Sequence, residues 1–314
     1  MTVVPESEDL DRSPGPCVFV LSGGGNLGAA QVGMLRAFLA AGVVPEAFAA
    51  CSVGALNAAY LAAGPTEARL NALADIWTNV RREDIFPGGH LKQIANLLRH
   101  HDHLHSPGAL RDLIQRFAPA GDLGDLAIPT HVVTTNLGTG EASWWSNGPI
   151  VDVLTASTAI PGLFPPVVLN GELHVDGGVL HTVPVVGAGN LVPSRVVVLD
   201  VSCHGLDQPV PRSSLGVLLR TFTLARRSRF DLDIADLGVA CEVTVVRLPT
   251  IGRLGLDDFS RSEELMAVGE QAALDAMSQT AVELEVSTAR LGVGAASIGP
   301  PAEPRTGTWV MGNR

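Results

Sequence analysis

Apolar runs and amphipathic segments alternate through most of the chain. Five short, largely apolar runs predict strands at 17–21, 48–51, 131–135, 195–201 and 241–248; the first of them is rich in valine and is followed by glycines. Helical spacing of apolar residues predicts helices at 32–39, 53–63, 214–228 and 260–285. Strands that alternate with helices predict an α/β fold whose mostly parallel central sheet is covered on both faces.

Residues 84–120 interrupt this alternation. They hold an apolar-periodic helix with Leu91, Ile94 and Leu98, a histidine-rich loop, and a second helix with Leu110 and Phe117 on its apolar face. An insertion of this kind beside a sheet edge predicts a helical cap that faces lipid or closes as a lid.

The two ends differ in composition from the body of the chain. Residues 1–15 are acidic and broken by proline, which predicts a disordered segment, and residues 292–314 are rich in glycine, proline and alanine, which predicts a flexible tail. No linker or repeat divides residues 16–291, so we expect one domain there. The first residues do not resemble a signal peptide and no apolar run is long enough to span a bilayer, so we expect a cytoplasmic protein.

Composition and charge limit the partners. The 314 residues are 46% hydrophobic and only 4% aromatic, so alanine, valine and leucine must form most of the core. The net charge of −11 argues against a nucleic-acid partner, because such proteins neutralise phosphates. The four cysteines form no CxxC pair, and the histidines at 100–105 do not form the H-E-x-x-H pattern of a metalloprotease helix, so we expect no metal site.

A glycine-rich turn follows the first predicted strand. Residues 23–28 read GGGNLG and open a helix, which literally matches the GxGxxG pattern of dinucleotide-binding proteins. Glycines let the backbone approach a ligand, and the N–H groups of a helix start attract negative charge. That charge would be a pyrophosphate in a Rossmann-type nucleotide-binding protein, or the oxyanion of a tetrahedral intermediate in an acyl-transfer enzyme.

The segment from Ala50 to Gly54 reads ACSVG and lies between a predicted strand and a predicted helix. It nearly matches G-x-S-x-G, the nucleophile elbow, in which a serine occupies a strained strand-to-helix turn. Ser52 as a simple helix N-cap would fit the same position. Ala50 replaces the first glycine, and alanine cannot adopt a glycine-only conformation cheaply.

A third short motif, Asp176-Gly177-Gly178, follows the polar-apolar run Gly171–Val175. Alone, an aspartate before two glycines is most often a turn.

Together these motifs resemble the patatin-like phospholipase family. The resemblance rests on GGGNLG, on SVGALNAA from Ser52, on ASTAIPGLFPP at 156–166 and on Asp176-Gly-Gly, in this order. It extends from about Cys17 to about Met277 and includes weaker blocks at 139–141 and 258–261.

The resemblance implies a three-layer α/β/α sandwich and a serine–aspartate dyad. Ser52 would be the nucleophile and Asp176 its base, since a serine hydroxyl needs a base within hydrogen-bond reach. It also implies an oxyanion hole formed by the turn residues Gly23, Gly24, Gly25 and Asn26. The other small residues of the three motifs would keep these turns tight; they are Gly28, Ala50, Gly54, Gly177 and Gly178. The substrates would be phospholipids, lysophospholipids or other acyl esters, met at a membrane surface, with no metal or cofactor. Nothing in the sequence indicates an oligomeric state.

Three departures from the family pattern keep alternatives open. Leu27 stands where many members carry lysine or arginine, which favours less polar esters over phosphate head groups. Leu27 and Ala50 together also fit a catalytically weak, patatin-fold lipid-binding protein. His181-Thr182 replace the usual asparagine, and the chain order Ser52, Asp176, His181 would suit a conventional triad, whereas His174 precedes the aspartate. We expect Ser157 and Asn136 to shape the pocket.

Overall fold

The computed structural model describes residues 15–86, 107–119, 121–202, 214–238, 240–252, 254–255 and 258–291. Contacts divide the chain into two units, Met1–Met277 and Ser278–Arg314, and the described part of the second unit is the last stretch of one helix. None of the described helices combines the length and apolarity that a bilayer crossing requires. The predicted end segments, the helix around Leu91 and the histidines at 100–105 lie outside the described residues.

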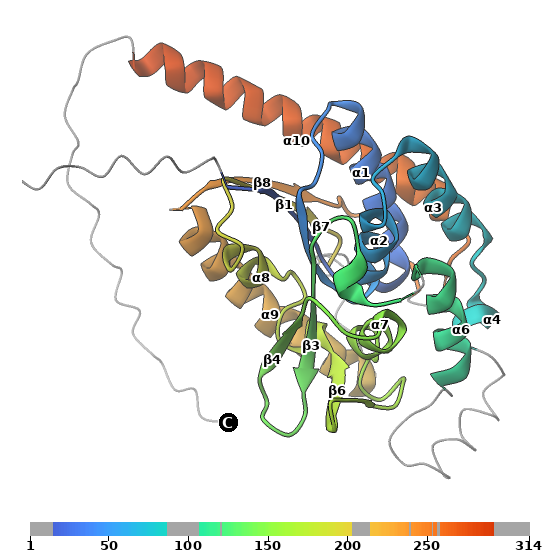
Figure 1. The fold of residues 1–314 in the computed structure, drawn as a ribbon. Coiled ribbons are helices and arrows are strands. Elements are labelled where there is room, and N and C mark those ends of the chain that lie inside the picture. Colours follow the sequence, from blue (N-terminus) through green and yellow to red (C-terminus); the bar gives the residue numbers. More distant parts are fainter. Residues whose placement is uncertain are drawn as a thin grey trace, which may run out of the picture. The chain divides into compact units, whose positions relative to one another are not determined.

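One sheet of eight strands forms the centre of the first unit (Figure 1). Its order is β5-β6-β3-β2-β1-β7-β8, and β4 also pairs with β3. The strands are β1 (Cys17–Leu21), β2 (Ala47–Cys51), β3 (Thr130–Asn136), β4 (Ala142–Trp145), β5 (Val167–Leu169), β6 (Glu172–Asp176), β7 (Arg195–Asp200) and β8 (Glu242–Arg247). The pairs among β3, β2, β1, β7 and β8 are parallel, whereas β4, β6 and β5 add antiparallel pairs.

Helices connect the strands in the order that the pattern predicts. The described helices are α1 (Gly28–Ala40), α2 (Val53–Ala62), α3 (Glu67–Asn79), α4 (Arg82–Ile85), α6 (Pro107–Phe117), α7 (Ile150–Ser157), α8 (Val185–Gly189), α9 (Ser214–Gly238) and α10 (Ser262–Leu291). Short 3₁₀ turns lie at Gly25–Leu27, Leu123–Asp125 and Gly177–Val179. The predicted helices at 214–228 and 260–285 therefore exist but continue to Gly238 and Leu291.

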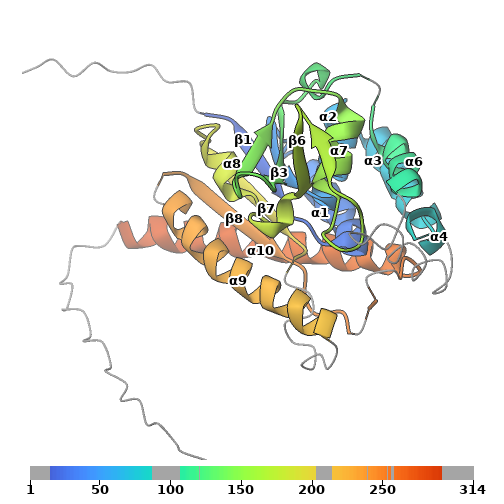
Figure 2. The ribbon, with the colours of Figure 1, turned by 90° about the horizontal axis from the view of Figure 1, so that it is seen from below.

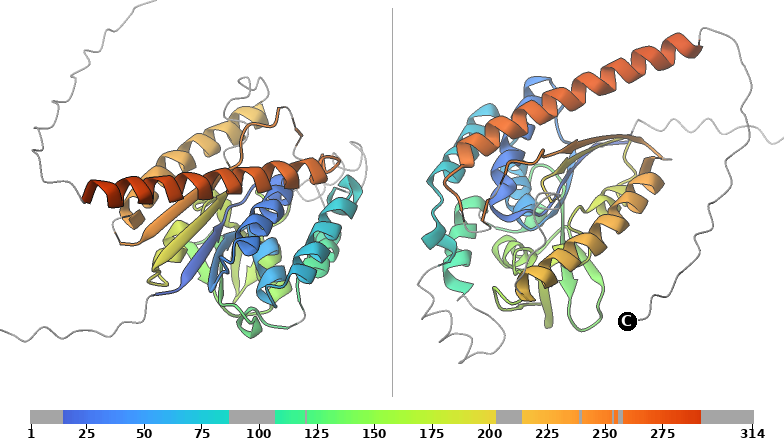
Figure 3. Two further views of the ribbon diagram at one scale, coloured as in Figure 1. Left: turned by 90° about the horizontal axis from the view of Figure 1, so that it is seen from above. Right: turned by 180° about the vertical axis from the view of Figure 1, so that it is seen from behind.

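Alternate residues of the central strands face two separate cores. Phe19 and Leu21 of β1 pack with α1, α2, α3, α6, α7 and the first half of α10, whereas Val18 and Val20 pack with α8 and α9. The views from below, above and behind show α1 and α9 on opposite sides of the strands (Figures 2 and 3). This arrangement confirms the predicted α/β class, with a central sheet between layers of helices.

Strand β3 brings together two segments that are far apart in the sequence. Val133 pairs with Cys51 of β2 on one edge and with Trp144 of β4 on the other, and the next residue, Thr134, pairs with Asp176 of β6. Since β4 occupies one edge of β3 from Val132 to Thr135, where both β2 and β6 also pair with β3, β2 and β6 must follow each other along the opposite edge. The end of β6 therefore meets the end of β2, where Ser52 follows.

Candidate active site

Ser52 occupies the sharp turn between β2 and α2. Its backbone has φ 53° and ψ −125°, a strained conformation for a residue with a side chain. The turn is tight enough that a Cβ on Gly54 would collide with the carbonyl oxygens of Leu21 and Ser22. Ala50, by contrast, lies inside β2 with an ordinary negative φ, so this position does not need glycine. The strain at Ser52 is the geometry of a nucleophile elbow.

Ser157, the last residue of α7, connects this turn to β3 by hydrogen bonds. Its hydroxyl accepts a hydrogen bond from the Ser52 N–H at 3.0 Å and donates one to the Val133 carbonyl oxygen at 2.8 Å. The side chain is fully buried. The sequence predicts that Ser157 shapes the pocket; its hydroxyl lies behind the Ser52 turn, against β3.

Asp176 lies directly against Ser52. The Ser52 hydroxyl donates to Asp176 Oδ2 at 2.7 Å, although the two residues are 124 positions apart in the chain. The other carboxylate oxygen, Oδ1, accepts the Gly178 N–H at 2.7 Å and contacts the Cys51 thiol at 3.7 Å. Gly177 packs so closely on β3 that a Cβ there would collide with the Val133 carbonyl oxygen. The two glycines after Asp176 thus orient its carboxylate.

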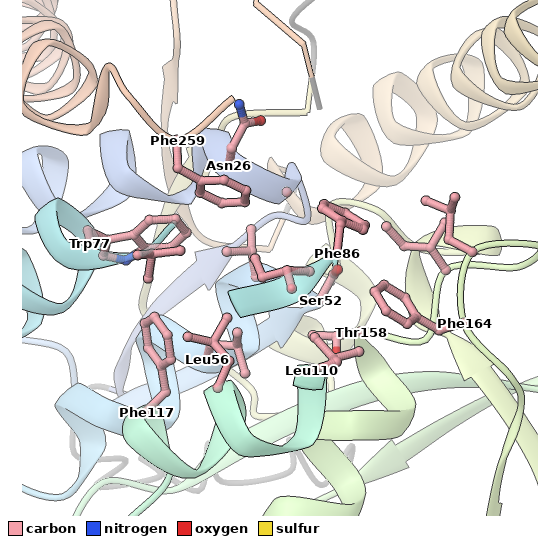
Figure 4. Close-up of a pocket in the computed structure, with 17 residues that line it drawn as sticks. Asn26, Ser52, Leu56, Trp77, Phe86, Leu110, Phe117, Thr158, Phe164 and Phe259 are labelled. Atoms are coloured by element: carbon pink, nitrogen blue, oxygen red, sulfur yellow. The ribbon is translucent and has the colours of Figure 1, made fainter. Parts of the chain in front are cut away.

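The glycine-rich turn passes the mouth of the same site. The Gly23 N–H donates to the Thr182 carbonyl oxygen at 2.8 Å, so it is engaged in fixing the turn. The Gly24 and Gly25 N–H groups have no acceptor among the residues that the structure describes; Gly24 is the N-cap and Gly25 the first residue of a 3₁₀ turn, whose start attracts negative charge. Asn26 turns its side chain away from Ser52 and donates to the carbonyl oxygens of Gly255 and Asp258, at 2.9 and 2.6 Å (Figure 4).

Two hollows meet at Ser52. The inner one has an open volume of about 680 Å³ and is lined almost entirely by apolar side chains from α2, α3, α4, α6 and the loops at 158–164 and 259 (Figure 4). The outer one, of about 1040 Å³, contains Asp176, the glycine-rich turn, Thr182 and Ser202. Leu27 is buried at this second hollow, where its side chain brings no charge. Ser52, Gly25 and Asn26 line both hollows.

The two histidines near the motif have other surroundings. Trp145 Nε1–H donates to the Thr134 hydroxyl at 2.8 Å, and that hydroxyl lies 3.0 Å from His174 Nδ1. Burial lowers the pKa of His174 below its ordinary value, with Glu172 opposing this, which fits a neutral ring that accepts at Nδ1. The His181 ring lies 5.4 Å from the Trp144 ring, centroid to centroid. Over the described ranges, no three histidine, cysteine or acidic side chains gather as metal ligands would.

The sequence of the chain matches one protein family and several of its known members. A family model described as patatin-like phospholipase matches residues 19–188, more than half of the chain. The chain is 27% identical over 184 residues to patatin-like phospholipase domain-containing protein 7 of Rattus norvegicus, covering 58% of this chain and 13% of that protein. It is 31% identical over 168 residues to an uncharacterized NTE family protein of Mycobacterium tuberculosis, covering 52% of this chain and 43% of that one.

Two solved structures were also found. VipD from Legionella pneumophila aligns over 85% of this chain and 67% of its own, with a TM-score of 0.45 and 15% identity. The type III effector ExoU aligns over 85% and 54%, with a TM-score of 0.34 and 14% identity. The chain spans less than half of the length of the two curated relatives described above. On the family match over residues 19–188, the chain belongs to the patatin-like phospholipase family.

Proposed function

We propose that this protein is a serine lipid acyl hydrolase that cleaves carboxylic esters with a Ser52–Asp176 dyad. The main evidence for this proposal is the 2.7 Å hydrogen bond from the Ser52 hydroxyl to Asp176 Oδ2. It lies where an apolar pocket meets a glycine-rich turn. An apolar pocket suits an acyl chain, and a serine bonded to a base suits acyl transfer.

In the proposed reaction Asp176 Oδ2 takes the hydroxyl proton as Ser52 Oγ attacks the ester carbonyl carbon. The carbonyl oxygen becomes an oxyanion, for which the N–H groups of Gly24, Gly25 and Asn26 are the proposed donors. One donor of this kind contributes about 2.7–4 kcal/mol to transition-state stabilisation. The alcohol leaves with the proton from Asp176, and an acyl ester on Ser52 remains. Asp176 then takes a proton from water as the water oxygen attacks the acyl carbon, and it returns that proton to Ser52 Oγ as the carboxylic acid leaves, which restores both side chains.

The family match and the position of the glycine-rich turn favour this function over the alternatives. In the nucleotide-binding alternative the turn would face a phosphate, but Gly25 and Asn26 line an apolar hollow together with Ser52. Ala50 gives no support to the weak-enzyme alternative, because its place in β2 tolerates a methyl group. The uncharged Leu27 supports esters with weakly polar leaving groups.

The test is covalent labelling with a fluorophosphonate probe in the presence of EDTA, together with hydrolysis of p-nitrophenyl esters and of lysophospholipid. The wild type should be labelled and active, Ser52→Ala should lose both, and Asp176→Asn should slow both sharply while keeping its fold. His181→Ala should remain active if the dyad is correct and should lose activity if a conventional triad operates. A folded wild type that binds lipid vesicles but is neither labelled nor active would support the lipid-binding alternative.

The proposal includes the setting of the reaction. An apolar pocket suits an acyl chain drawn from a lipid surface, so we propose peripheral contact with membranes. We keep the cytoplasm, expected from the sequence, as the proposed compartment. Sedimentation with vesicles of neutral and anionic phospholipid tests that contact, and fractionation of cells that express the protein tests the compartment.

A further inference from the structure

Three of the aromatic side chains that line the inner pocket contact one another. Trp77 and Phe117 meet edge to face with ring centroids 5.8 Å apart, and Phe259 stacks on Trp77 at 6.5 Å. Figure 4 shows Trp77 and Phe117 together on one side of the pocket, opposite Phe164, with Leu56 between Phe117 and Ser52. A chain that entered the pocket from Ser52 would therefore pass Leu56 and meet these rings.

Hydrogen bonds fix the Trp77 ring in place. Its Nε1–H donates to Asn57 Oδ1 at 2.9 Å, and the Asn57 amide donates to the Gly28 carbonyl oxygen at 2.9 Å and to Gln31 Oε1 at 3.0 Å. Asn57 and Gln31 are fully buried. A Cβ on Gly28 would come within 2.8 Å of the Trp77 ring, so the ring lies directly on α1. Trp77 cannot move aside without leaving buried polar groups unpaired.

The third ring is also tied to the core of the site. The Asn26 side-chain amide donates hydrogen bonds to the carbonyl oxygens of Gly255 and Asp258, and Asp258 directly precedes Phe259. The Ser262 hydroxyl donates to the Phe259 carbonyl oxygen at 3.0 Å. These bonds connect the loop that carries Phe259 to the glycine-rich turn, so this ring too belongs to a fixed surface.

We propose that Trp77, Phe117 and Phe259 form a fixed end wall that sets the longest acyl chain this protein accepts. The proposal rests on the proposed hydrolase function. An acyl chain that stops short of the wall leaves part of the pocket unfilled, and a longer one must displace rings that are held by packing and hydrogen bonds. Selectivity for acyl-chain length then follows from the distance between Ser52 and the wall rather than from the head group.

The first test is the dependence of kcat/KM on chain length for p-nitrophenyl esters from acetyl to palmitoyl. Phe117→Ala, which opens the wall, should move the optimum to longer chains, and Leu56→Phe, which narrows the path, should move it to shorter ones. Because one methylene in an apolar pocket changes kcat/KM by about tenfold or more, the ratio for long over short esters should change by at least that factor. Phe230→Ala is the matched control. Phe230 is buried in the core on the other face of the sheet, so its loss should lower the melting temperature and leave the chain-length optimum unchanged.

The second test needs no catalysis. Fatty acids brominated at the terminal carbon should quench Trp77 fluorescence only when the chain is long enough to reach the wall, and Trp77→Phe should remove this quenching. Quenching that does not depend on chain length, or an unchanged optimum in both folded pocket variants, would overturn the proposal. If quenching requires a minimum chain length but no ester is hydrolysed, the end wall is supported and the hydrolase function is refuted. If esters are hydrolysed but the chain-length optimum does not change in the pocket variants, the hydrolase function is supported and the end wall is refuted.

Discussion

Replacing Ser157 by alanine tests whether a single buried hydroxyl holds Ser52, the proposed nucleophile, in place. The change removes the acceptor of the Ser52 N–H and the donor to the Val133 carbonyl oxygen. Leaving a buried N–H unsatisfied costs about 1–3 kcal/mol. We expect Ser157→Ala to lower the free energy of unfolding by about 2 kcal/mol, which corresponds to a fall in melting temperature of about 4–8 °C.

The effect on catalysis should exceed what this loss of stability explains. Ser52 keeps φ 53° and ψ −125° only because its surroundings hold it there, and without Ser157 the turn can relax. A displacement of about 1 Å at a reacting atom can lower the rate about 100-fold. We expect kcat to fall about 10- to 100-fold while KM stays within about twofold, since Ser157 does not line either hollow.

Thermal unfolding by circular dichroism and steady-state ester hydrolysis measure the two effects. Ser146→Ala, at an exposed position in the turn after β4, is the matched control and should change neither. A Ser157→Ala protein with the kcat of the wild type, measured well below its melting temperature, would show that other contacts hold the elbow and would refute this reasoning.

Three further predictions concern backbone space and pH. Gly25 and Gly42 both have a positive φ, and a Cβ added at either would meet no other atom. Gly25→Ala and Gly42→Ala should therefore each lower the free energy of unfolding by about 1 kcal/mol. Only Gly25→Ala should also lower kcat sharply, because Gly25 lines both hollows and its methyl group would enter them. Gly54→Ala should cost at least about 1–3 kcal/mol in thermal or urea unfolding, because its Cβ meets fixed carbonyl oxygens, and wild-type stability would contradict the elbow geometry. The lowered pKa of His174 means that, below its ordinary pKa of 6.5, the unfolded chain takes up a proton more readily than the folded one, so this residue lowers stability as pH falls. His174→Asn should therefore lose less melting temperature than the wild type between about pH 7.5 and pH 5, and an equal loss would refute this assignment.

The parallel half of the fold could be predicted because its signals are local. The apolar runs of β1 and β2 are bounded by glycine and serine, and each is followed at once by a helical pattern, so the turns at Gly23 and Ser52 fall where the sequence predicts them. The antiparallel strands were not predicted in this way. β4 is only half-buried, and β5 has three residues.

Two missed elements did carry a recognisable signal. Asn170-Gly171, with φ 50° and 84°, forms the two-residue turn between β5 and β6, and an Asn-Gly pair between short apolar runs is typical of a hairpin. Thr66 caps α3, and Leu70, Leu73 and Trp77 follow at helical spacing. Recognising α3 would have brought Trp77 into the site analysis.

The contacts of other site residues could not be predicted from the sequence, even where the resemblance singled out Ser157. Gln31, Asn57 and Ser157 are polar residues within helices, where most such residues face solvent. Their importance comes from carbonyl oxygens on other elements, such as that of Val133 on β3, which only the folded chain brings near. For the same reason the sequence could not show that Ala50 lies in regular strand backbone, where a methyl group is tolerated.

The arrangement around Asp176 gives a physical reason why two side chains would suffice for the proposed reaction. In a Ser-His-Asp triad the third side chain orients the base toward the serine. Here the proposed base is itself a carboxylate with two oxygens: Oδ1 accepts a hydrogen bond from the Gly178 N–H, and Oδ2 accepts one from the Ser52 hydroxyl. The backbone of the glycine turn and the register of β6 on β3 orient this carboxylate, so a third side chain is not needed for that purpose. Moving that register by one residue would turn the carboxylate to the other face of the sheet, so the dyad depends on the antiparallel pairing that the sequence pattern does not reveal.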